Sequence, residues 1–108
     1  MSNSSFENDE DKKLEVLANA TLRRTDADQA AALRDETGRT YVAINIATKT
    51  FYLDAIEAVF TIAMTSQIVG IEAVVIVGDG PINTALIREF APAALIWYVS
   101  QNGEIKAL

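Results

Sequence analysis

The sequence predicts an α/β protein: a three-layer α/β/α sandwich on a mixed sheet that begins with an antiparallel hairpin. Two strand-like segments at residues 29–35 and 39–47, separated by a short turn with a glycine, predict the hairpin. A long apolar segment at 53–68 follows, and the overall order is helix–strand–strand–helix–strand–helix–strand. That order favours helices packed on both faces of a sheet with parallel inner strands.

The N-terminal part combines an arm with a first helix. Residues 1–9 are polar and acidic, and we expect a disordered arm there. Residues 10–24 carry apolar side chains such as Leu14 and Leu17 at helical spacing, with acids at the start and arginines at the end. Those charges suit the helix dipole. We expect residues 10–108 to form a single domain.

The hairpin is predicted from its turn and its alternation. Glu36, Thr37 and Gly38 supply a tight reversal between the two strands. In the second strand apolar residues alternate along the chain as far as Ile46, so one face is strongly apolar.

Residues 53–68 predict a helix that is apolar on nearly all sides. Such a helix is expected to be buried on nearly all sides, through contacts between subunits as well as within the core. Its only charges are Asp54 and Glu57, which share one face with Thr61.

The C-terminal part alternates buried strands with turns and one short helix. The expected elements are a buried strand at 71–77, a loop at 78–81, a helix at 82–90, a buried strand at 94–100 and a turn at 101–104 before a short final segment. Asn83 or Asp79 is the candidate cap of the helix, and Pro92 ends it.

Composition and charge exclude several classes of protein. The 108 residues carry a net charge of −6 and no basic stripe, so nucleic-acid binding is not expected. No apolar run reaches the roughly 18–20 residues that span a bilayer, so no membrane association is expected. The polar start lacks the pattern of a secretory signal, and a cytoplasmic location is expected. The chain has no cysteine and no histidine, which leaves no base for a nucleophilic triad.

Several stretches, in order and at matching spacing, resemble the cytidine deaminase-like family of zinc-dependent cytidine and deoxycytidylate deaminases. Residues 30–34 and 38–46 are similar to the opening hairpin of that family, and residues 71–77 to its third strand. Residues 88–92 resemble the end of its second zinc helix, residues 95–96 the next strand, and residues 102–104 the turn that follows. The resemblance spans about residues 29–106 and implies the family's fold.

The resemblance also implies a zinc ion that this chain has no residues to hold. In the family a His or Cys precedes Ala-Glu at one helix start, and Pro-Cys-x-x-Cys opens the next helix; the Glu moves protons. Counting back from 71–73 places Asp54 at the ligand and Ile56 at the glutamate, whereas a slip by one places Ala55 and Glu57 there. At the second segment Gly80 and Asn83 stand where the cysteines would be. The chain is therefore identified as a degenerate member without zinc ligands, and we expect no catalytic residue, no metal and no cofactor.

A ligand could still use the remains of such a site. The resemblance implies ribose binding by an Asn-x-Glu pair, of which Asn45 matches the first residue and Ala47 replaces the second. The candidate ligand-binding residues are Asn45, Asp54, Glu57, Asp79 and Asn83. Asp79 enters because a loop of the form Gly-Asp-Gly before a helix can cradle an anion, although a plain turn is the simpler interpretation.

Three functions follow from these observations. The first is a catalytically inactive structural or interaction subunit that forms a homo-oligomer, either a dimer or a tetramer. The second is a binding module for a nucleoside-like or nucleotide-like small molecule near Asn45, Glu57 and Asn83. The third, least favoured, is an active cytidine deaminase with a metal held by Asp54 and Glu57.

Overall fold

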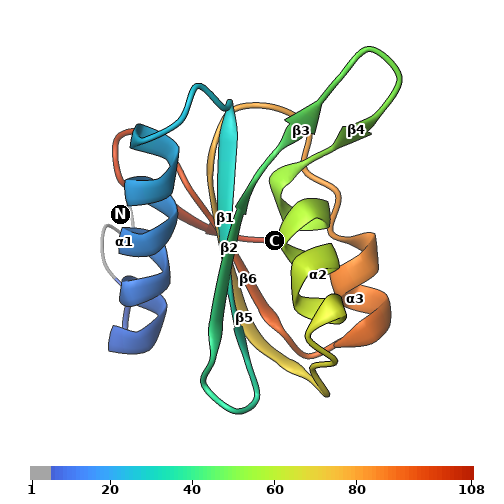
Figure 1. Cartoon of the computed structure of the whole chain (residues 1–108). Coiled ribbons are helices and arrows are strands. Elements are labelled where there is room, and N and C mark those ends of the chain that lie inside the picture. Colours follow the sequence, from blue (N-terminus) through green and yellow to red (C-terminus); the bar gives the residue numbers. More distant parts are fainter. Residues whose placement is uncertain (1–5) are drawn as a thin grey trace.

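A single sheet with helices on both faces organises the chain. The computed structural model describes residues 6–108. Helix α1 (Asp9–Arg23) covers one face of the sheet, and α2 (Ala55–Thr65) and α3 (Ala85–Phe90) cover the other (Figure 1). The predicted three-layer sandwich is confirmed.

The main sheet has five strands in the order β2-β1-β5-β6-β7. These strands are β1 (Gln29–Asp35), β2 (Thr40–Ile44), β5 (Ile71–Gly78), β6 (Leu95–Val99) and β7 (Ile105–Ala107). The central pair β5 and β6 is parallel, and every other pairing is antiparallel. The expected mixed sheet with a leading hairpin is therefore present, and the short final segment of the chain adds its last strand.

The sheet separates two layers of core because side chains alternate between its faces. On β1, Ala31 and Leu33 pack toward α2 and α3, whereas Ala30 and Ala32 pack toward α1. Every residue of β1 is buried. This double burial explains why the middle of the strand, residues 30–33, is apolar at consecutive positions rather than at alternating ones.

The predicted strand at 39–47 is wrong as a single element. It breaks after Ile44, and β3 (Ile46–Ala47) pairs instead with β4 (Tyr52–Leu53) in a small separate hairpin (Figure 1). The break lies at Asn45, whose side chain accepts hydrogen bonds from the backbone at the start of β1.

Both predicted helices after the hairpin are shorter than expected. The segment 53–68 is helical only over α2, because Asp54 caps its start and Gln67 takes a positive φ of 59° beyond its end. One face of α2 is also exposed: Ile62 is 44% exposed. The helix at 82–90 begins only at Ala85.

The predicted arm overlaps the start of the domain. Residues 1–5 lie outside the described residues, so disorder there stays a prediction. Phe6 packs edge to face on Trp97 with ring centroids 5.7 Å apart. Asn8 caps α1 by accepting a hydrogen bond from the Glu10 backbone, and Asp9 is helical. Residues 6–9 therefore belong to the packed structure.

No helix in the described part of the chain is long and apolar enough to cross a membrane.

Candidate functional site

Helix α2 begins with a reciprocal cap that fixes two of the candidate residues. Asp54 Oδ1 accepts a hydrogen bond from the backbone N–H of Glu57 at 2.8 Å. Glu57 Oε1 accepts one in return from the Asp54 N–H at 3.0 Å. An acid followed three residues later by Glu favours this capping box, and the helix dipole favours carboxylates at this end.

Asn83 joins this cap to the start of α3. Its backbone N–H donates to Asp54 Oδ2 at 2.6 Å, and its side-chain Nδ2 donates to Glu57 Oε2 at 3.1 Å. Its Oδ1 accepts from the N–H of Ala85, the first residue of α3. The structure thus brings Asp54, Glu57 and Asn83 into one hydrogen-bonded group.

Asn45 binds the backbone beside Gln29, a buried residue that the sequence analysis missed and that contacts the sequence neighbours of this group. Asn45 Oδ1 accepts from the N–H groups of Asp28 and Gln29 at 3.1 and 2.9 Å. The fully buried Gln29 side chain donates to Pro81 O at 2.7 Å and accepts from Ala55 N–H at 3.1 Å. A glutamine directly before the apolar run at 30–33 is the signal that could have revealed it.

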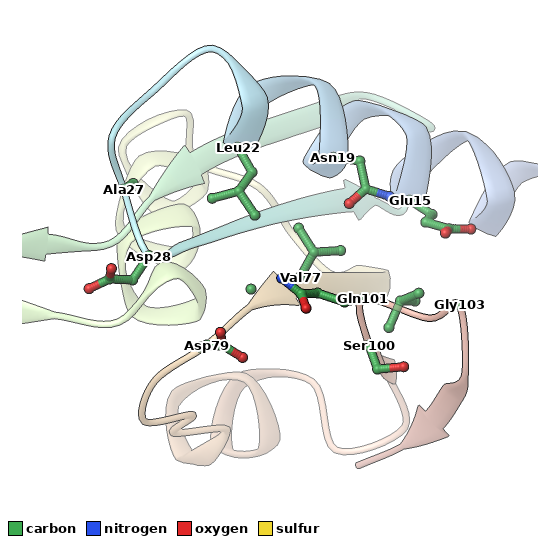
Figure 2. A pocket seen from close by; sticks show the side chains of 12 residues that line it. Glu15, Asn19, Leu22, Ala27, Asp28, Val77, Asp79, Ser100, Gln101 and Gly103 are labelled. Carbon is green, nitrogen blue, oxygen red and sulfur yellow. The ribbon is translucent and has the colours of Figure 1, made fainter.

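Asp79 lies apart from the other candidates. It is exposed and lines a pocket of about 450 Å³ on the α1 side of the sheet, together with Asp28, Glu15 and Asn19. Figure 2 shows the Asp28 and Asp79 carboxylates toward one end of this pocket and Glu15 and Ser100 toward the other. The pocket is acidic, and no lysine or arginine lines it. Its chemistry therefore differs from the anion cradle considered for this loop.

The central carboxylate of this group, that of Asp54, is almost completely removed from solvent. Asp54 is 1% exposed, and this desolvation raises its pKa above the ordinary value for an aspartate. The N–H donors of Glu57 and Asn83 oppose the shift, while the negative charge of Glu57 adds to it. The net result is a carboxyl that holds its proton more tightly than a surface aspartate.

Comparison with known families decides the assignment. A family model described as "Cytidine deaminase-like" matches residues 7–103. The chain belongs to the cytidine deaminase-like family. A search of curated proteins found no match.

Solved structures of cytidine deaminases share the fold of this family member at low sequence identity. The enzyme from Burkholderia pseudomallei is 18% identical, with a TM-score of 0.78 over 90% of each chain. The enzyme from Bacillus anthracis is 15% identical, with a TM-score of 0.72 over 94% of this chain and 83% of that one. The enzyme from Mycobacterium leprae is 16% identical, with a TM-score of 0.69 over 89% of this chain and 91% of that one.

The residues at the two helix starts do not fit the zinc ion that the resemblance implies. Both carboxylate oxygens of Asp54 and both of Glu57 already accept hydrogen bonds. Gly80 has a φ of +130°, and a Cβ there would lie 3.2 Å from Gln29 Nε2, so a cysteine would be strained at this position. Among residues 6–108 no group of three or more histidine, cysteine or acidic side chains could hold a metal. The family fold is present without the family's donor set.

The structure also bears on the two alignments of the first zinc segment. Ile56 is fully buried in the core between the sheet and α2. Glu57 instead turns its carboxylate to Asn83, the position counted as a cysteine. Of the two residues counted at the glutamate, Glu57 contacts the second segment and Ile56 is buried in the core.

Proposed function

We propose that this protein is a non-catalytic cytidine deaminase-like subunit that acts through association with other chains, first of all with copies of itself. The observation that carries the proposal is the pair of helix starts, where hydrogen-bonded Asp54, Glu57 and Asn83 replace thiolate or imidazole donors. A bound zinc lowers the pKa of water from about 15.7 to about 7. Losing roughly nine units costs about 12 kcal/mol of nucleophile activation, which two hydrogen-bonded carboxylates do not supply.

An apolar surface beside α2 supports a role in association. A groove of about 270 Å³ runs between α2 and the strands β2, β3 and β4, and Thr61 is the only polar residue among those that line it. Ile46 and Ile62 on this groove are 40% and 44% exposed. Phe51 and Tyr52, on the segment that leads into the groove, are also exposed. Contiguous exposed apolar surface favours an interface between proteins.

The first test is the molar mass in solution. We expect light scattering at tens of micromolar protein to give a dimer or a tetramer. A monomer under these conditions contradicts self-association.

The second test separates the proposal from nucleoside binding and from catalysis. Thermal-shift measurements with millimolar nucleosides and nucleotides are expected to leave the melting temperature unchanged, since a ligand that binds the native state raises it. Stabilisation by a nucleoside would favour the binding module instead. Release of ammonia from cytidine would favour the enzyme.

A further inference from the structure

The starts of α2 and α3 are tied together by side chains across 29 residues of sequence. We propose that Asp54, Glu57 and Asn83 form a metal-independent clasp, which joins these two helix starts where the family would place its metal. The inference rests on the family fold and on these contacts, and it does not depend on how the protein associates.

The contacts exceed what helix capping needs. An N-cap residue needs one oxygen for the first turn of its helix. Asp54 uses Oδ1 for that purpose, and its Oδ2 accepts a second hydrogen bond from the N–H of Asn83 at 2.6 Å. Glu57 likewise uses one oxygen within the cap and the other on Asn83 Nδ2. Each carboxylate therefore serves both helices.

Helix α3 needs such an anchor because it is short. It has six residues, and Thr84 at its N-cap position makes no side-chain capping hydrogen bond. Isolated helices of this length are not stable in water. Asn83 supplies the missing acceptor to Ala85 N–H while it is held by Asp54 and Glu57. Farther from the clasp, Phe60 of α2 packs on Phe90 of α3 with centroids 5.9 Å apart.

The clasp also explains how a buried acid is tolerated in this position. Burial and the nearby Glu57 charge raise the Asp54 pKa, and N–H groups from both helix starts oppose that rise. Beside the clasp, the buried Gln29 side chain joins the same two segments: it accepts from the Ala55 N–H and donates to Pro81 O. All four carboxylate oxygens of the clasp accept hydrogen bonds, so a metal at this place would compete with the N–H groups for the same oxygens.

Amide exchange tests the clasp against a simple cap. Asp54→Ser keeps a capping oxygen for the Glu57 N–H but is too short to reach Asn83 as well. In the full chain we expect the Glu57 amide to stay protected in Asp54→Ser, while the Asn83 amide exchanges at least about tenfold faster than in the wild type. In Asp54→Ala both amides should exchange faster. Unchanged exchange at Asn83 in Asp54→Ser would overturn the clasp.

A matched control removes a cap from another helix. Asn8→Ala deletes the capping bond to the Glu10 N–H at the start of α1. It is expected to speed exchange at Glu10 and leave Asn83 unchanged. If Asn8→Ala speeds Asn83 to the same extent as Asp54→Ser, the effect is global destabilisation, and the clasp is rejected.

A measurement on the wild type keeps the proposal falsifiable if the Asp54 variants do not fold. Because the clasp needs no metal, neither excess EDTA nor added zinc should shift the melting temperature. A loss of several degrees in EDTA, or a gain of several degrees with stoichiometric zinc, would show that a metal makes this tie.

Discussion

Arg34 Nη2 on β1 lies 2.8 Å from Asp11 Oδ1 on α1, and both side chains are buried. A β-bulge in β5 leaves Glu72 unpaired in the ladder and places its carboxylate 2.7 Å from Arg34 Nε. Trp97 Nε1 donates to the other oxygen of Asp11 at 3.3 Å. This group of polar side chains joins the first helix to three strands of the sheet.

Breaking the Arg34–Asp11 pair is expected to destabilise the fold strongly. Arg34→Met leaves the buried Asp11 without its cationic partner and should cost about 3–5 kcal/mol, whereas Asp11→Ala should cost less because Arg34 keeps its ion pair with Glu72. The double variant Asp11→Leu/Arg34→Met should lose less than the two single losses together, because no charge is stranded. Urea unfolding followed by the fluorescence of Trp97, the only tryptophan, measures all three.

The control for this series is an exposed ion pair on the same helix. Lys13 and Glu10 are 3.0 Å apart with exposed side chains. Lys13→Ala should change stability by less than about 1 kcal/mol. Equal losses for Lys13→Ala and Asp11→Ala would contradict the importance given to the buried pair.

Asp35 is expected to make the fold sensitive to acid. Burial disfavours its charged form, but donors from Thr37, Arg39 and Tyr41 outweigh that effect and lower its pKa. A lowered folded-state pKa gives stability that is present above the unfolded-state pKa and is lost as pH falls through the folded-state pKa. Asp35→Asn should be less stable than the wild type at neutral pH and approach it in acid. Urea unfolding at stepped pH checks this, and a constant difference would contradict it.

The ionisation of Asp54 is expected to change the stability of the fold with pH in the opposite direction. Its pKa is raised, chiefly by burial, so its contribution to stability is full below its unfolded-state pKa and falls as pH rises through its folded-state pKa. An NMR titration of its carboxyl carbon should give a midpoint above that of an ordinary aspartate, and Asp35 should titrate below it. A reversed order of the two midpoints would show that the account of the two environments is wrong.

The apolar groove yields a prediction about association. Ile62→Asp and Phe51→Asp each place a charge on or beside the exposed apolar surface of α2 and β4. We expect both variants to be monomers by light scattering under conditions where the wild type associates. Val16→Asp serves as the control, because Val16 is exposed on α1 across the sheet. Dissociation by Val16→Asp alone would place the interface on the other face.

The apolar elements of the fold could be predicted from the sequence because their pattern is local. The core segments of β1 and β5 were found within one residue of their ends, since runs such as 71–77 have few polar interruptions. The break at Asn45 was missed because the apolar alternation continues through Ile46. What ends the strand there is a hydrogen bond to Gln29, which is distant in sequence.

The sequence predicted several residues of the site but not the contacts between them. The sequence places Asp54 and Glu57 on one helix face, and their separation of three residues is the spacing of a capping box. The hydrogen bond between Asp54 and Asn83 could not be predicted from the sequence, because it depends on how the loop after β5 packs against the start of α2. Asp79 is near Asn83 in sequence, yet it faces a different pocket on the far side of the sheet.

The central claim is that this chain keeps the cytidine deaminase-like fold without its metal chemistry. The most direct measurement is elemental analysis of untagged protein from zinc-supplemented cells, combined with an assay of ammonia release from cytidine on the same sample. The account predicts far less than one zinc per chain and no turnover above the uncatalysed rate. Stoichiometric zinc together with cytidine turnover would contradict it.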